Sequence, residues 1–504
     1  MRLPNTWNTL KQRRVTVDPY APIAAPADKL RPLNGMDGAP RALHPELADV
    51  LVPYWNRPSG SGADDGAHVD IVRVGPTSGC DLGLDRLFPN PAANPDDPNQ
   101  YRFTALDAAV RSASDVGGEG IVVQLGFSRC ATDLEAELDR AATWASVGAH
   151  VIRHLVGGSS WDPRGLTAPV VAVELLDDPL YTYHLAEADR ERAFDLFAAM
   201  AHALRTTYPD GKPLIAGPSV RIGGARDVTT AGTSIAAFLA RADAFPLDVL
   251  SYRVADDDPR AAAAIGKALR ARLDALGRTT TELFLTEMTP VTPPGFPTPW
   301  TAEGDGAWLA AAHLGAYEAS ARAYLQDVPV SWALSGLGPW TFADGADHAF
   351  QPLAQSEELL VPSAYFTREG LPTPAFMLRL PIRQFAGKRV TTESDADLAV
   401  VATHDGFVLH ILIAASHVEA GVAAVDYELN VPAFVPAAVR RVGYRFAELD
   451  QGNRSLGSFF FSDLGTLEPS LRSGDLVIRR TIPVPGVHYL EIVRPDPSGT
   501  FTTP

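Results

Sequence analysis

Residues 170–208, VVAVELLDDPLYTYHLAEADRERAFDLFAAMAHALRTTY, contain one complete strand–loop–helix unit. The apolar run Val170–Leu176 is typical of a buried strand, and Glu187–Tyr208 repeats its apolar residues at the spacing of an amphipathic helix. A weaker strand candidate lies upstream at Leu30–Asn34. Other apolar runs of the same kind are Ile71–Val74, Ile121–Phe127, Leu214–Gly217, Leu247–Tyr252, Leu283–Glu287 and Val328–Leu334.

Ala-rich stretches with helical spacing separate these runs. They are Thr104–Val116, Asp133–Val156, Ile235–Arg241, Ala261–Leu276 and Gly306–Leu325. A strand followed by a helix, repeated about eight times, predicts an α/β fold of the parallel (β/α)8 TIM-barrel type. A doubly wound open sheet is the competing architecture, and the lack of a GxGxxG turn after the first strand counts against it.

The pattern changes after Pro374 to alternating apolar and polar residues, with turn residues such as Asp405-Gly406 between the runs. This predicts a C-terminal antiparallel β-sandwich, to which the early run Arg14–Val17 could add a strand. The predicted organisation is therefore an N-terminal segment at 1–29 that pairs with the sandwich, a catalytic barrel at 30–375 and a sandwich domain at 376–504. The predicted sandwich strands are Arg389–Thr392, Leu398–Thr403, Gly406–Ile413, Ala424–Val431, Ala438–Glu448, Asp475–Ile482 and Val487–Val493.

Charge and composition limit the partners. The 504 residues include 60 acidic and 43 basic side chains, a net charge of −17, which disfavours nucleic acid and anionic membrane surfaces but not a neutral sugar. The two cysteines, Cys80 and Cys130, indicate neither a disulfide framework nor a zinc site, and no cofactor motif is found. We find no signal peptide and no membrane-spanning run, so we expect a soluble cytoplasmic protein; a homo-oligomer stays open.

Acidic residues stand at the ends of two predicted barrel strands. The fourth strand runs into Asp177 and Asp178, and the seventh ends at Glu287. The loops that follow barrel strands build the active site, so carboxyl groups at these ends would face each other across the barrel mouth, as glycoside cleavage requires. Ion pairing within the mouth is the structural alternative. Glu174, deeper in the fourth strand, is a spare candidate that we expect to be a hydrogen-bonded core residue.

Several short motifs follow one another along the chain: VDIVRVG (69–75), DDPNQYRF (96–103) with Asp107 after it, LGFS (125–128), IRH (152–154), AGP (216–218), LDVLS (247–251), LTE (285–287) and GLPTPA (370–375). In this order they resemble glycoside hydrolase family 39, the β-xylosidase and α-L-iduronidase group of clan A, and its bacterial relatives. The resemblance covers most of the chain. It implies a glycosidase that acts on a small oligosaccharide or glycoside, with Glu287 as the retaining nucleophile and Asp178 as the acid/base.

The chain departs from the family pattern at the predicted site. Family members typically have Trp-Asn-Glu-Pro where residues 176–179 read LDDP, and Ser-Trp-His where residues 251–253 read SYR. Asp178 is one methylene shorter than the usual Glu, which would widen the gap between the two carboxyl groups toward that of inverting enzymes unless the backbone compensates.

Other residues near strand ends are predicted to contact substrate. Arg73 could bind a hydroxyl or form an ion pair in the barrel mouth, and a Trp face could stack under a pyranose, with core packing as the alternative. The predicted substrate-binding residues are Asp177, Arg73, Arg253, Tyr183, His184, Trp332 and Trp300.

Two other functions remain open from the sequence. The altered acid/base position favours a non-catalytic carbohydrate-binding relative. Alternatively, Arg253 could clamp the carboxylate of an acidic sugar in an enzyme of changed specificity.

Overall fold

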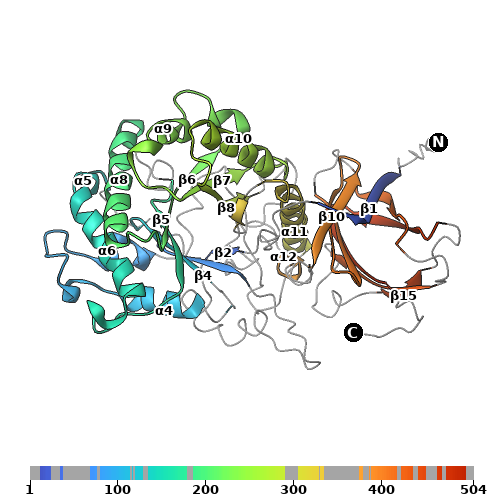
Figure 1. Ribbon diagram of the computed structural model, residues 1–504, viewed down its shortest axis with the longest axis horizontal. Helices are drawn as coiled ribbons and strands as arrows, with labels where there is room; N and C mark the ends of the chain where they lie inside the picture. The colour runs from blue at the N-terminus through green and yellow to red at the C-terminus, as the bar shows by residue number, and fades with distance from the viewer. Residues whose placement is uncertain are drawn as a thin grey trace. The chain divides into compact units, whose positions relative to one another are not determined.

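The structure, a computed structural model, describes residues 12–23, 35–37, 69–76, 80–113, 116, 120–128, 134–178, 186–289, 305–328, 330–333, 374–378, 385, 387–416, 422–434, 441–449, 463–467 and 473–494. The chain divides into two compact units (Figure 1). One unit comprises Arg31–Thr301 and Leu325–Leu371, and the other comprises Met1–Leu30, Ala302–Tyr324 and Pro372–Pro504.

The first of these units holds a parallel sheet whose strands follow one another in chain order from β2 to β9. This arrangement confirms the predicted barrel with a separate β domain. Most predicted strands match in place, whereas the candidate at Leu30–Asn34 lies outside the described residues. The strands are β2 (Gly35–Asp37), β3 (Ile71–Val74), β4 (Gly120–Leu125), β5 (Val170–Leu175), β6 (Leu214–Ile222), β7 (Val249–Ala255), β8 (Glu282–Thr289) and β9 (Val330–Ala333).

Helices alternate with these strands and lie along the outside of the sheet (Figure 1). The predicted helix at Asp133–Val156 is divided in two, α5 and α6. No helix in the described part of the chain is long and apolar enough to cross a membrane. The α-helices of this unit are α3 (Leu84–Leu87), α4 (Thr104–Ala113), α5 (Leu134–Leu138), α6 (Ala141–Val156), α8 (Arg190–Thr207), α9 (Ser234–Ala240) and α10 (Ala261–Ala275).

An apolar layer crosses the barrel sheet. Each strand from β3 to β8 contributes one buried side chain to it: Ile71, Val122, Ala172, Ala216, Val249 and Phe284. Alternate residues of a strand point to the same face, so the residues two positions further on form the next layer toward the carboxyl ends of the strands. That layer is polar on most strands, and its members are Arg73, Gln124, Glu174, Pro218, Ser251 and Thr286. The candidate site is built on this polar layer.

The second unit corresponds to the predicted sandwich. In the described ranges it holds one nine-stranded sheet, whose strands pair antiparallel except at one place. Strand β1 pairs antiparallel with β10 and parallel with β13, which attaches the N-terminal segment to the sandwich. Strand β15 has no counterpart among the strands predicted from sequence. The strands are β1 (Arg13–Pro22), β10 (Lys388–Ser394), β11 (Ala399–His404), β12 (Val408–Ala415), β13 (Ala424–Val431), β14 (Val442–Leu449), β15 (Asp463–Leu467), β16 (Leu476–Pro483) and β17 (Gly486–Val493).

The long helix α11 (Asp305–Leu325) packs on this sandwich, together with the short helix α12 (Pro374–Met377). The small side chains Ala316, Ala319 and Ala323 of α11 contact a cluster that includes Leu412 and Tyr489. The predicted boundaries place this helix within the barrel segment 30–375, but its contacts group it with the sandwich. Alanines three and four residues apart form a smooth face that lets a helix lie close against a sheet, and the sequence pattern does not say which sheet.

Candidate active site

A buried ion pair forms the floor of the candidate site. Nη1 of Arg73 on β3 lies 2.9 Å from Oε2 of Glu174 on β5, and both side chains are at most 2% exposed. Nε2 of Gln124, on the strand between them, donates a hydrogen bond of 3.3 Å to the same carboxylate oxygen. Glu174 is therefore the buried, hydrogen-bonded residue expected from the sequence. Arg73 takes the ion-pairing role that the sequence offered as one of two possibilities.

Charges of alternating sign continue from this floor to the strand ends. Arg73 Nη1 lies 4.0 Å from Oδ1 of Asp177, and the same Asp177 oxygen forms an ion pair with Nη2 of Arg253 on β7. Nη1 of Arg253 lies 3.5 Å from Oε2 of Glu287 on β8. The order is thus Glu174, Arg73, Asp177, Arg253 and Glu287, a chain of three carboxylates and two guanidinium groups. The Glu287 side chain is 29% exposed, while the other four are at most 5% exposed.

Two β-bulges set the positions of Arg253 and Glu287. Pairing along β7 passes from Tyr252 opposite Leu285 directly to Arg253 opposite Glu287, so Thr286 is an extra residue in β8. Ser219 is the corresponding extra residue in β6. A shift of one residue moves a side chain to the other face of a sheet. The bulge in β8 therefore brings Glu287 to the same face as Arg253.

The hydroxyl groups of the two bulge residues, Ser219 and Thr286, form a hydrogen-bonded network with Arg253. Nε of Arg253 donates a hydrogen bond of 3.2 Å to Oγ of Ser219, and Oγ of Ser219 is also hydrogen-bonded to Oγ1 of Thr286. The Ser219 backbone N–H donates to Oγ of Ser251, and Oγ1 of Thr286 donates to the carbonyl of Tyr252. These contacts help to fix the position of the Arg253 guanidinium.

Asp178 lies at the end of β5 and connects it to β6. Its backbone N–H donates to the carbonyl of Pro218, and its Oδ2 accepts a hydrogen bond from the backbone N–H of Arg221, both at 2.8 Å. The residue is 4% exposed. Asp178, Leu176 and Ser219 have φ angles of 39°, 53° and 58°, in the left-handed region that non-glycine residues rarely adopt. Such strained positions cluster at functional sites.

The structure brings together four predicted site residues: Arg73, Asp177, Arg253 and Glu287. Asp178 is next to Asp177 in the same turn. The remaining predictions are not tested, because Tyr183, His184 and Trp300 lie outside the described residues and, for Trp332, only its backbone position in β9 opposite Phe284 is given.

Several polar residues of this region were not predicted from sequence, among them Ser219, Thr286 and Asp256. Ser219 and Thr286 gave no signal, because a single extra residue in a strand leaves the apolar pattern almost unchanged. Asp256 directly follows β7 in the run Asp256-Asp257-Asp258, and acidic residues just after a barrel strand could have marked it as a site residue. Burial, together with its acidic neighbours, raises the pKa of Asp256 above its usual value. A carboxyl group that protonates more readily than usual therefore lies in the loop after β7.

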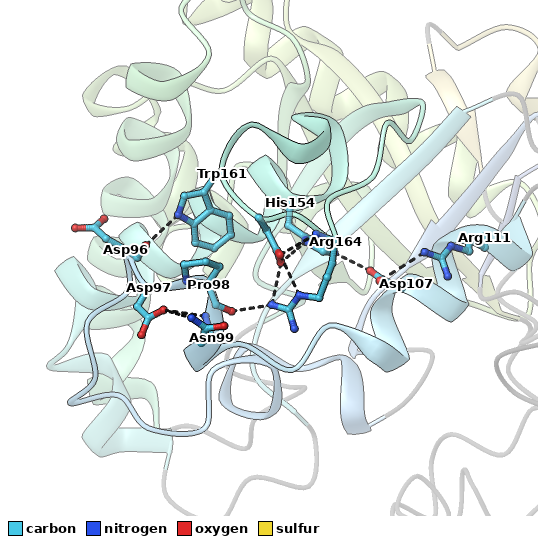
Figure 2. Close-up of polar contacts among 10 residues, drawn as sticks. Asp96, Asp97, Pro98, Asn99, Asp107, Arg111, His154, Trp161 and Arg164 are labelled. Carbon is cyan, nitrogen blue, oxygen red and sulfur yellow. Dashed lines mark hydrogen bonds and ion pairs between the residues drawn. The ribbon is translucent and has the colours of Figure 1, made fainter.

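The motif at 96–103 with Asp107 belongs to a different cluster (Figure 2). Both ring nitrogens of the buried His154 face carboxylates, Nε2 at 2.8 Å from Asp107 and Nδ1 at 3.0 Å from Asp162. Phe103 stacks on the His154 ring at a centroid distance of 3.7 Å, and Arg164 holds Asp162 with two side-chain hydrogen bonds. Through these contacts, Phe103 and helix α4 pack against helix α6.

A metal site is not evident in the described ranges, where no three His, Cys, Asp or Glu side chains are arranged to hold an ion. The chain of charges at the strand ends neutralises its carboxylates with arginines instead.

Comparisons with known proteins bear on the fold. No protein-family model matches the sequence, and no curated protein matches it. Among solved structures, a glucosidase from Croceicoccus marinus is similar with a TM-score of 0.65 and 21% identity, over 96% of this chain and 99% of the other. The GH39 enzyme from Xanthomonas axonopodis pv. citri has a TM-score of 0.64 and 16% identity, over 98% of this chain and 99% of that enzyme. A monomeric beta-xylosidase from Caulobacter crescentus has a TM-score of 0.62 and 13% identity, over 96% and 99% of the two chains. The chain therefore has a GH39-like glycoside hydrolase fold, as the resemblance implied.

Proposed function

We propose that this protein is a glycoside hydrolase in which Glu287 is the nucleophile. The observation that carries the proposal is the place of Glu287: it stands near the carboxyl end of barrel strand β8, beside Arg253, as the accessible end of an otherwise buried chain of charges. A nucleophile must reach its substrate, and the Glu287 side chain is 29% exposed while the other four members of the chain are buried. The GH39-like fold of the chain supports the same reaction class.

We assign the acid/base role to Asp178. Its carboxylate lies at the end of β5, where Oδ2 accepts a hydrogen bond from the backbone N–H of Arg221. In the first step, an oxygen of Glu287 attacks the anomeric carbon while Asp178 protonates the leaving oxygen and the glycosidic C–O bond breaks. In the second step, Asp178 takes a proton from water, whose oxygen displaces Glu287 and releases the sugar with its configuration retained.

The test uses aryl glycosides that differ in their sugar: xyloside, arabinofuranoside, glucoside and galactoside. We expect release of the aryl group from at least one of them, and loss of that activity in Glu287→Gln, a variant that should still be folded and unfold cooperatively in urea. The matching 2-deoxy-2-fluoro glycoside should form an ester on Glu287 that mass spectrometry of peptides can locate. Absence of release across the panel between pH 4 and 9 would reject the proposal, and labelling of another residue would reject the role of Glu287.

A carbohydrate-binding protein without turnover is the second candidate. The observation in its favour is that Asp178 is 4% exposed and that its carboxylate accepts a hydrogen bond from the backbone of β6. Both are unusual for a residue that must reach a leaving group. Calorimetric binding of a sugar by a protein that releases no aryl group would support this candidate. The acidic-sugar alternative loses its main argument, because three nitrogens of Arg253 already contact Ser219, Asp177 and Glu287. A cytoplasmic location and a homo-oligomeric state stay predictions from the sequence.

A further inference from the structure

The side chain of Arg253 is fixed by protein groups on three sides. Nε donates to Oγ of Ser219 at 3.2 Å, Nη2 forms the ion pair with Asp177, and Nη1 lies 3.5 Å from Oε2 of Glu287. A guanidinium is planar and permanently charged, and its donors diverge at fixed angles. Two anchored nitrogens therefore determine where the third one points. It points at Glu287.

The anchors are themselves rigid. Asp177 is 1% exposed and lies between two guanidinium groups, those of Arg253 and Arg73. Ser219 is fully buried, and its hydroxyl oxygen is hydrogen-bonded to Thr286 as well. Charges that are shielded from water interact more strongly than charges at the surface. The guanidinium is thus held by buried groups, whereas Glu287 is the member of the chain that water and a ligand can reach.

We propose that Arg253, oriented by Asp177, is a positioning residue that holds the Glu287 carboxylate toward the barrel mouth. The role of Glu287 that it serves rests on the proposed function. In this proposal Arg253 and Asp177 act through Glu287, whereas the sequence predicted that they bind substrate. The bulge at Thr286 is part of the same device, because it places Glu287 opposite Arg253 across the sheet.

Substitutions of Arg253 should separate charge from shape. Arg253→Gln removes the charge, and Arg253→Lys keeps the charge but loses the fork that spans Ser219, Asp177 and Glu287. We expect Arg253→Gln to lower kcat on the best aryl glycoside by about 100-fold, as small misplacements of a reacting group do, with KM changed less than about 3-fold. Arg253→Lys should fall between Arg253→Gln and the wild type, and Asp177→Asn should lower kcat in the same direction.

A matched control lies at the opposite ends of the same strands. Nη2 of Arg205 forms an ion pair of 2.5 Å with Asp248, the residue just before β7. Arg205→Gln removes an Arg–Asp contact that is more exposed, at 30% and 29%, and far from the strand ends that carry Glu287, so we expect kcat and KM to be unchanged. A large rise in KM with unchanged kcat for Arg253→Gln would show that Arg253 binds substrate, and would overturn the positioning role.

A second measurement does not depend on turnover. Urea unfolding of Arg253→Gln, Glu287→Gln and the double variant gives the interaction between the two side chains as the departure from additivity. We expect the change in urea midpoint of the double variant to differ clearly from the sum of the changes in the two single variants. Additive shifts would overturn the proposal even if the protein is an active glycosidase. Conversely, non-additive shifts in a wild type that cleaves no glycoside would reject the proposed function and leave the contact established.

Discussion

Arg73→Met should destabilise the barrel unit because it leaves a buried carboxylate without its counter-charge. The nearest charged atoms of Arg73 and Glu174 are 2.9 Å apart. At an effective dielectric constant of about 20, that separation corresponds to an attraction of about 6 kcal/mol, which offsets the cost of removing both charges from water. Removing one partner of such a pair typically costs about 3–5 kcal/mol. We expect a loss of that size, with the hydrogen bond from Gln124 to Glu174 still in place.

The assay is urea unfolding followed by tryptophan fluorescence. Six of the eight tryptophans belong to the unit formed by residues 31–301 and 325–371, and residues 372–504 contain none, so the signal reports mainly on the barrel. The double variant Arg73→Met with Glu174→Leu removes both charges and should recover most of the loss. Arg260→Met, which breaks an ion pair with Asp258 whose side chains are 48% and 31% exposed, should cost less than about 1 kcal/mol.

Two outcomes would refute this reasoning. A loss below about 1 kcal/mol for Arg73→Met would mean that the pair behaves as an exposed one despite its burial. A double variant as unstable as Arg73→Met would mean that packing, rather than an uncompensated charge, causes the loss.

Three further predictions concern the acid/base, the sandwich and the packing around the site floor. Asp178→Asn should lower kcat by about 100- to 10,000-fold on glycosides with poor leaving groups, with a smaller effect on activated aryl glycosides, because only the former require protonation; equal losses on both would refute its acid role. Burial lowers the pKa of His410 to about 4 in the folded sandwich, so this neutral histidine contributes stability above pH 6.5 that is lost as the pH falls toward 4. The loss amounts to about 3 kcal/mol, because the pKa of His410 is 6.5 in the unfolded chain and about 4 in the folded protein. A wild type that is no more acid-sensitive than His410→Gln in urea titrations would contradict this prediction. The raised pKa of the neighbouring Glu491, caused by burial, acts in the opposite sense, which is why the comparison with His410→Gln is needed. Gly75→Ala should cost about 1–3 kcal/mol, because its Cβ would lie 2.6 Å from the carbonyl oxygen of Gln124, whereas Gly224→Ala meets no atom within 4 Å and should be neutral in the same urea assay.

The strand–helix order was predictable from the sequence because it depends on apolar periodicity alone. Runs such as Ile71–Val74 are buried on both faces in the structure and carry a strong signal. The boundaries of β6 and β7 were less accurate, since their ends carry polar residues that reach into the site. The partner of α11 was not predictable, because an alanine-rich face fits a barrel or a sandwich equally well.

The identity of the site residues was predictable to a different extent. Glu287 followed from its place at a strand end and Arg253 from the comparison with the family pattern. Their mutual distance depends on the bulge at Thr286, which no periodicity reveals. The turn after β5 likewise depends on a left-handed Leu176, a conformation that its side chain does not favour. Local backbone exceptions, rather than residue types, therefore determine which predicted residues meet.

The departures from the family pattern change meaning once their contacts are known. In the sequence, Asp177 in place of Asn and Arg253 in place of His are two separate irregularities, each of which counts against an active enzyme. In the structure these two side chains form an ion pair with each other. A carboxylate introduced alone at position 177 would be a buried charge without compensation, and a guanidinium introduced alone at position 253 would be the same with opposite sign. Because each neutralises the other and Nη1 of Arg253 lies 3.5 Å from Glu287, the two departures form one compensated change rather than two independent ones.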